Sequence, residues 1–262
     1  MATYTWLPDA FIPPPHQPEP VYDKNGKEIT PPRAPIPARP VFTAFDLETT
    51  GLEKTRDRIV EIGAVKFDAM GVIARFNVLI NPGIPMPPEA GRVNGISDEM
   101  LADKPPIEEV MGDFVDFVGD SILIAHNAPF DTGFVNEALS ILHRQVAEDP
   151  SQMSLLGGSG ADDAPGGTGG DNADGTDGAV TGGRERKRRW RAPWPALPNR
   201  IVDTRILAKE SFPNRPNYKL QDLASWLGIE AIAAHRAEDD ARVCMDLFVK
   251  CVEAIKSRRG TP

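Results

Sequence analysis

Two stretches of this chain have compositions that cannot build a packed core, and they decide where a folded domain can lie. Residues 1–40 are dominated by proline, a density incompatible with helices and central strands. Residues 157–183 hold eleven glycines and five aspartates but no lysine or arginine, so they cannot bury enough apolar surface to fold. The sequence therefore predicts one folded domain over 41–258, preceded by a Pro-rich flexible arm at 1–40. A disordered insert at about 150–198, first Gly/Asp-rich and then basic, interrupts this domain.

Between these stretches the apolar residues follow the periods of strands and helices in a mixed order. Strands are predicted over 41–48, 58–67, 72–80, 121–125 and 200–203, with a hairpin turn at 68–71. The proline-rich stretch that begins at Asn81 is predicted to be a loop, with no helix before residue 107. Helices are predicted over 107–118, about 130–142, 204–211, 220–227 and 236–258. This order predicts an α/β fold, in which a mixed β-sheet is flanked by α-helices.

Charge and composition exclude several classes of protein. The net charge of −9 does not fit a protein that binds DNA by bulk electrostatics, but it fits an enzyme that reaches phosphates through bound cations. The sequence has no apolar run of about 18 residues and no secretory signal pattern, so no membrane partner is expected. Cys244 and Cys251 lie too far apart along one predicted helix to form a disulfide, which predicts reduced thiols in a cytoplasmic protein.

The first acidic site ends the predicted strand over 41–48. Side chains alternate along a strand, so Asp46 and Glu48 point to the same face. Two anions this close repel each other unless a cation lies between them, and hard divalent cations prefer oxygen ligands. The alternative is a solvated strand end that carries two surface acids.

The second acidic site, residues 126–131, follows a predicted buried strand and opens a helix. Asp131 would lie in the first turn of this helix, where an acid can instead serve as a cap. His126 lies at the end of the strand and is expected to form structural hydrogen bonds.

The third acidic site lies at the start of the last predicted helix. His235 precedes the helix and Asp240 lies in its second turn, so the histidine can reach the same pocket as the aspartate. The alternative for this site is an acidic first turn that complements the helix dipole. Glu238 and Asp239 are expected to serve only that purpose.

Together, the three sites resemble the exonuclease motifs of the DEDDh (DnaQ-like) 3′→5′ exonuclease family, typified by the proofreading epsilon subunit of bacterial DNA polymerase III. The matching segments are Phe-Asp-Leu-Glu-Thr-Thr-Gly at 45–51, His-Asn-Ala-x-Phe-Asp at 126–131 and His-x-Ala-x-x-Asp at 235–240. The resemblance covers residues 41–143 and 200–257 and leaves out the arm and the insert. It implies a ribonuclease H-like fold and 3′→5′ exonuclease activity.

The resemblance also implies a role for each motif residue. Asp46, Glu48, Asp131 and Asp240 would be catalytic and would bind two divalent cations, Mg²⁺ or Mn²⁺. His235 would be the general base, since histidine titrates near the operating pH. The residues implied to bind the terminal nucleotide of the substrate are Thr49, Thr50, Gly51, Leu52, Asn127 and Phe130.

The leading prediction is an enzyme that releases nucleoside 5′-monophosphates from a single-stranded or frayed 3′ end of DNA, in proofreading or repair. An exoribonuclease acting on short RNA or RNA 3′ ends is the alternative, because contacts to the sugar 2′ position decide between the two. A third interpretation is an inactive nucleic-acid-binding or replisome adaptor, against which the five intact catalytic positions argue.

Two segments outside the motifs suggest partners. Gln152–Leu156 resembles the peptide by which bacterial replication proteins bind the sliding clamp, and the alternative is an apolar linker. The basic run at 184–191 either binds a phosphate backbone or neutralises the acidic stretch before it. A DNA polymerase subunit is the further partner that the resemblance implies.

Overall fold

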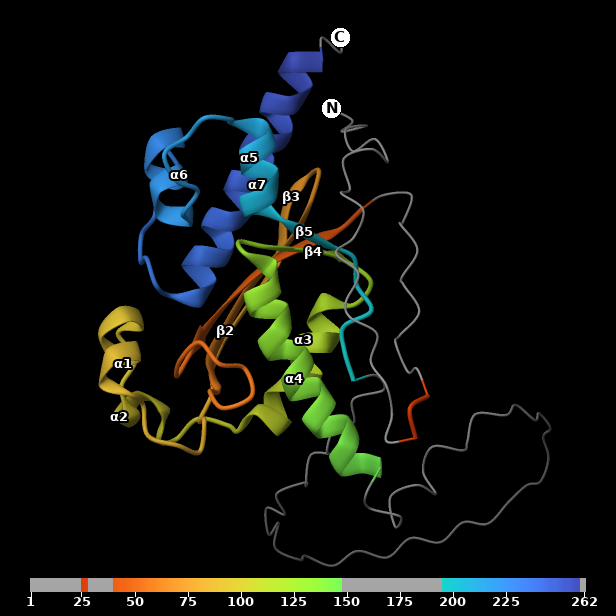
Figure 1. The fold of residues 1–262 in the computed structure, drawn as a ribbon, viewed down its shortest axis with the longest axis vertical. Coiled ribbons are helices and arrows are strands. Elements are labelled where there is room, and N and C mark those ends of the chain that lie inside the picture. The colour runs from red at the N-terminus through yellow and green to blue at the C-terminus, as the bar shows by residue number, and fades with distance from the viewer. Residues whose placement is uncertain (1–24, 28–39, 148–194, 260–262) are drawn as a thin grey trace, which may run out of the picture.

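The computed structural model describes residues 25–27, 40–147 and 195–259, and its centre is a five-stranded sheet in the order β3-β2-β1-β4-β5 (Figure 1). Neighbouring strands pair antiparallel between β3, β2 and β1, and parallel between β1, β4 and β5. The predicted mixed sheet is therefore confirmed. The strands are β1 (Phe42–Thr49), β2 (Ile59–Asp68), β3 (Gly71–Leu79), β4 (Ile122–Ala125) and β5 (Ile201–Asp203).

Helices cover both faces of this sheet (Figure 1). On one face lie α3 (Ile107–Val118) and α4 (Ala128–Ala147). On the other lie α5 (Thr204–Ser211), α6 (Leu220–Leu227) and α7 (Ala237–Arg259). No helix in the described parts of the chain is both long and apolar enough to cross a membrane.

The prediction of a continuous loop between Asn81 and residue 107 is wrong, because two short helices lie there. They are α1 (Pro88–Asn94) and α2 (Asp98–Leu101). Proline is tolerated at the first position of a helix, where its missing N–H has no helical partner to lose. The same proline that suggested a loop therefore begins α1 at Pro88.

The alternation of side chains along β1 divides the core into two clusters. Phe42 and Ala44 pack with residues of α7, whereas Phe45 and Leu47 pack with residues of α3 and α4. Asp46 and Glu48 continue the series of Phe42 and Ala44, so both carboxylates point to the α7 face. The strand thus presents its two acids to the helix that carries the third acidic site.

Candidate active site

Three carboxylates converge where β1 meets the start of α7. Asp46, Glu48 and Asp240 each offer an oxygen within 4.8 Å of the others. Asp240 lies in the first turn of α7, far from the two β1 acids in sequence. The structure therefore brings three of the four predicted metal ligands into one group.

The fourth predicted ligand, Asp131, lies beside this group rather than within it. It is 2% exposed in the first turn of α4, and the Leu47 backbone amide hydrogen-bonds its carboxylate. Burial first, and then the charge of Asp131, raise the pKa of Asp46 well above its ordinary value. The two carboxylates are close enough to influence each other electrostatically, as ligands of neighbouring cations would be.

Burial raises the pKa of each of the three carboxylates of this group and of the neighbouring Asp131. Burial and the charge of Asp240 raise the pKa of Glu48 to about 8. Burial likewise raises the pKa values of Asp131 and Asp240. Four oxygen-donor groups that are costly to ionise together form a site that a hard divalent cation stabilises, so these residues fit the implied metal ions.

Close backbone packing places the start of α7 over the sheet. Gly63 of β2 is the register partner of Asp46, and a Cβ at this position would lie 2.1 Å from the Ala237 carbonyl carbon and the Glu238 amide nitrogen. Only a glycine allows the helix to approach the strand this closely. The approach brings Asp240, in the same first turn of α7, to the carboxylates of β1.

A buried ion pair ties the same helix start to β2. Glu61 is fully buried and accepts hydrogen bonds from Arg236 Nε at 3.1 Å and Arg236 Nη2 at 2.9 Å. The positive charge of Arg236 partly offsets the effects that raise the pKa of Glu48. Sequence reasoning did not single out this pair. The feature that could have indicated it is Glu61 itself, an acid in the middle of an otherwise apolar strand, because a buried acid requires a partner.

Two amide side chains hold the acidic ligands from outside the recognised motifs. Gln221 of α6 donates to Asp240 Oδ1 at 2.6 Å, and Asn94 of α1 hydrogen-bonds Glu48 and the Thr49 carbonyl. Gln221 carries no pattern in sequence, and the segment 94–97 resembles the family only as a connection between motifs. Their roles appear only once α6 and α1 are placed next to the site.

Asp203, at the end of β5, hydrogen-bonds the chain segments that follow β4 and β5. Its carboxylate accepts hydrogen bonds from the amides of Asn127 and Ala128, at 3.2 and 3.1 Å, and from the Arg205 amide at 2.8 Å. One side chain therefore caps α5 and fixes the chain as it enters α4, the helix that carries Asp131.

His126 lies in the same region and does not face the carboxylate group. Its Nδ1 hydrogen-bonds the Thr204 hydroxyl at 2.9 Å and its Nε2 bonds the Tyr218 carbonyl at 2.8 Å. Burial lowers the pKa of this histidine. The prediction that His126 forms structural hydrogen bonds is confirmed.

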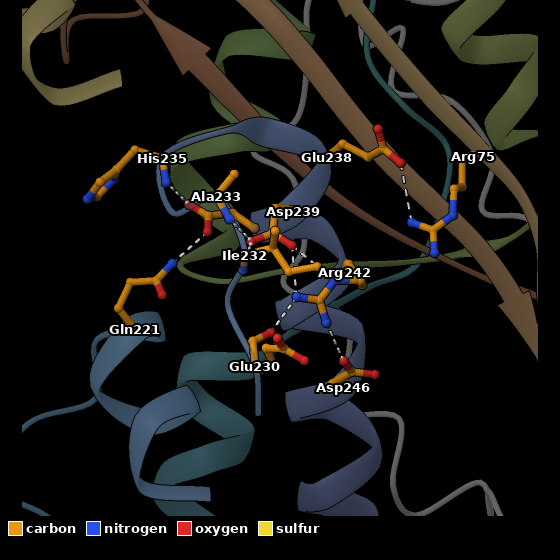
Figure 2. Close-up of polar contacts among 11 residues, drawn as sticks. Arg75, Gln221, Glu230, Ile232, Ala233, His235, Glu238, Asp239, Arg242 and Asp246 are labelled. Atoms are coloured by element: carbon orange, nitrogen blue, oxygen red, sulfur yellow. Dashed lines mark hydrogen bonds and ion pairs between the residues drawn. The ribbon is translucent and has the colours of Figure 1, made fainter. Parts of the chain in front are cut away.

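His235 lies just before α7 in an exposed loop and has a left-handed backbone conformation, with φ of 63°. Its backbone N–H donates to Asp240 Oδ2 at 3.1 Å. Figure 2 shows its imidazole extending outward from the loop. The backbone of His235 is thus joined to the metal-ligand group, while its ring remains open to a substrate or a water molecule.

The expectation that Glu238 and Asp239 only complement the helix dipole is wrong. Glu238 forms an ion pair with Arg75 of β3 at 3.3 Å. Asp239 accepts hydrogen bonds from the amides of Ile232 and Ala233 (Figure 2). Acids in a first turn can bond any donor that folds back over the helix, and the sequence does not show which donors do so.

The residues predicted to bind the terminal nucleotide differ in their surroundings. Thr49 and Thr50 are buried, and their hydroxyls bond the Gly51 carbonyl at 2.6 Å and the Arg58 amide at 2.9 Å. A Cβ on Gly51 would lie 2.4 Å from the Asp57 carboxylate. These three residues therefore shape the loop that follows β1.

The remaining three predicted nucleotide-binding residues are more accessible. Leu52 is 80% exposed in the loop that follows β1, whereas Phe130 is half-buried and its ring lies 5.0 Å from that of Phe134. Asn127 is exposed, has φ of 71°, and accepts a hydrogen bond from Arg205 Nη1 at 3.3 Å. Leu52 is the most exposed of the apolar groups predicted to contact the substrate.

A mixed sheet with carboxylates grouped at its centre defines a nuclease of the ribonuclease H-like fold, and comparison with known proteins agrees. The exonuclease family model RNase_T matches residues 43–156 and 182–248. The chain belongs to this exonuclease family. The prediction of a DnaQ-like 3′→5′ exonuclease is therefore confirmed.

Among curated relatives, the chain is 38% identical over 221 residues to the DNA polymerase III subunit epsilon of Treponema pallidum, covering 84% of this chain and 80% of that protein. It is 41% identical over 213 residues to the PolC-type DNA polymerase III of Bacillus subtilis. That match covers 81% of this chain but only 11% of the much longer polymerase.

Solved structures show the same fold. Exonuclease X in complex with 5′-overhanging duplex DNA superimposes with a TM-score of 0.52 at 20% identity, covering 84% of this chain and 94% of that one. Escherichia coli exonuclease I in complex with a dA16 oligonucleotide gives a TM-score of 0.56 at 16% identity, covering 84% of this chain and 42% of that one. At these identities the likeness supports the fold and not the substrate.

Proposed function

We propose that this exonuclease removes nucleotides from the 3′ end of DNA by metal-dependent hydrolysis, in proofreading or repair. One observation carries the proposal: three carboxylate oxygens lie within 4.8 Å of one another, beside the buried Asp131. The 38% identity to a DNA polymerase III epsilon subunit supports DNA rather than RNA as the substrate.

In this proposal Asp46, Glu48, Asp131 and Asp240 hold two cations, Mg²⁺ or Mn²⁺. Bound cations of this kind lower the pKa of a ligated water and stabilise a leaving oxygen. His235, whose ring is exposed and whose backbone N–H donates to Asp240, accepts the proton of the attacking water. Glu61 and Gln221 hold Arg236 and Asp240 in place while the proton moves.

The terminal nucleotide would rest on the loop that follows β1. Leu52 offers an exposed apolar side chain, and Phe130 offers a half-buried aromatic ring from α4. Apolar and aromatic contacts accept every base, as an enzyme that degrades any sequence requires. Thr49, Thr50, Gly51 and Asn127 would give the backbone and side-chain contacts around the 3′ hydroxyl.

A DNA polymerase subunit is the partner that best fits the relationship to epsilon and PolC-type proteins. The proposed sliding-clamp peptide, Gln152–Leu156, and the basic run at 184–191 lie outside the described residues. Both cysteines are free and buried, which agrees with a reducing, cytoplasmic setting.

The test uses purified wild-type protein with matched 5′-labelled DNA and RNA oligonucleotides, in Mg²⁺, Mn²⁺ or EDTA. The expected result is a ladder of shortened DNA that appears with either cation and disappears in EDTA. Asp46→Asn and Asp240→Asn should abolish it while the melting temperature shows a folded protein. Asp113→Asn, an exposed acid on α3, is the matched control and should keep full activity. Retained activity in Asp46→Asn would refute the metal-ligand assignment, and faster degradation of RNA would favour the exoribonuclease alternative.

A further inference from the structure

The loop that carries His235 has little packing to hold it in place. It connects α6 to α7, and residues 230–235 are all exposed, including Ile232 at 77%. A segment with few buried apolar contacts opens easily unless polar contacts restrain it. His235 itself has a left-handed backbone conformation, which residues other than glycine rarely adopt. Some other interaction must therefore fix this loop.

The carboxylate of Asp239 supplies that restraint from the first turn of α7. Its Oδ2 accepts the backbone amides of Ile232 and Ala233, both at 2.8 Å. Its Oδ1 accepts Arg242 Nε at 3.0 Å and Nη2 at 2.8 Å. Figure 2 shows the resulting arrangement, in which the loop folds back over the helix that follows it.

Arg242 extends the same restraint to the beginning of the loop. Its Nη2 donates to the Glu230 carbonyl, and its Nη1 pairs with Asp246 one turn further along α7 at 3.0 Å. The side chains of Arg242 and Asp239 are only 18% and 11% exposed. Charge-assisted hydrogen bonds in such partly buried positions are stronger than those of an exposed ion pair.

Asp240, the neighbour of Asp239, accepts the His235 amide. Two consecutive carboxylates therefore hold three amides of the loop, and only Asp239 is free of the metal-ligand group.

We propose that Asp239, together with Arg242, is a positioning residue that fixes the His235 loop so that the imidazole reaches the attacking water. This inference rests on the proposed role of His235 as the general base. In the contacts described, Asp239 forms no hydrogen bond with the carboxylate group or with the predicted nucleotide-binding residues. Its charge also acts on the adjacent Asp240, so the test includes a readout of the loop itself.

The test is a double-mutant cycle between Asp239→Ala and His235→Ala, read as kcat and KM on a labelled DNA oligonucleotide. Asp239→Ala should lower kcat by about 10²-fold and leave KM nearly unchanged, because a displaced catalytic group loses orientation rather than binding. In the His235→Ala background the same change should cost nothing further. Arg242→Lys, which keeps the charge but loses the two-pronged contact, should fall between wild type and Asp239→Ala.

Glu238→Gln is the matched control, since it alters the adjacent acid and its ion pair with Arg75 but not the loop. Hydrogen exchange of the amides of residues 232–235 gives a readout that does not depend on activity, and only the Asp239 and Arg242 variants should lose protection there. An additional loss of kcat in the His235→Ala background, or unchanged loop protection in Asp239→Ala, would overturn the positioning role while the base role stands. Full turnover in His235→Ala, with the loop loosened in Asp239→Ala, would instead refute the base assignment and the positioning role with it.

Discussion

Replacing Gly63 by alanine should separate the two halves of the carboxylate group. The new Cβ would lie 2.1 Å from two backbone atoms of α7, whereas ordinary contact begins at about 3.4 Å. The helix start must then retreat by about 1.3 Å, the difference between these distances. Neither atom belongs to a side chain, so no rotamer change can relieve the overlap.

The consequence for stability and for the reaction can be estimated separately. Overpacking of this kind costs roughly 1–3 kcal/mol, and each kcal/mol lowers the melting temperature of a domain this size by roughly 2–4 °C. Gly63 is the register partner of Asp46, so the retreat of α7 moves Asp240 away from that ligand. A displacement of about 1 Å at a reacting site costs on the order of 10²-fold in rate.

The measurements are thermal melting, the Mg²⁺ concentration for half-maximal activity, and kcat on a labelled DNA oligonucleotide. Gly63→Ala should remain folded, require more Mg²⁺ and lose about two orders of magnitude in kcat. Gly133→Ala on α4 is the control, because the nearest atom to its Cβ would be the flexible Lys54 Cδ at 3.3 Å. Wild-type kcat and Mg²⁺ dependence in Gly63→Ala would refute the argument that this glycine places Asp240.

Two further predictions concern charges at the same site. Burial raises the pKa of Glu48 from 4.5 to about 8, so the folded, metal-free protein favours the protonated form of this side chain. The stability that protonated Glu48 contributes is fully present below pH 4.5 and is lost as the pH rises through about 8. Glu48→Gln should therefore raise the melting temperature in EDTA above pH 8 but not near pH 4.5, and an equal shift at both would contradict the linkage. Arg236→Met should cost about 3 kcal/mol in urea unfolding, the low end for a broken buried pair, because the arginine is 39% exposed and Glu61 is not exposed. Adding Glu61→Gln to Arg236→Met should recover much of that loss, and a second loss of equal size would show that the two residues act independently.

The local pattern of the chain is sufficient to predict most of the elements. Period-two and period-3.6 patterns place the five strands and the five longer helices within two residues of their bounds, apart from the end of α4, predicted at 142 and found at Ala147. The ranges of α3, α5 and α6 coincide with the predicted ones. The misplaced region is the stretch that contains α1 and α2. The prolines in this stretch favour a loop when only neighbouring residues are considered. Pro88 instead occupies the first position of α1, where proline is tolerated.

Alternation along β1 is also enough to predict that Asp46 and Glu48 share a face. The segments around Asp131 and Asp240 are recognisable because residue types recur there in a fixed order. Such motifs are local in sequence, so sequence alone is enough to identify the class of enzyme and to name its candidate acids.

The distances between those acids depend on contacts between segments far apart in the chain. The close backbone approach at Gly63 and the ion pair between Glu61 and Arg236 place the start of α7 against β2. Asp239 restrains the loop that carries His235. The sequence around these residues does not show which partner each one contacts, because each acts on an element that folds against it from elsewhere. Packing between elements therefore settled the geometry of the site, since a backbone contact or a buried ion pair has no partner until the tertiary fold supplies one.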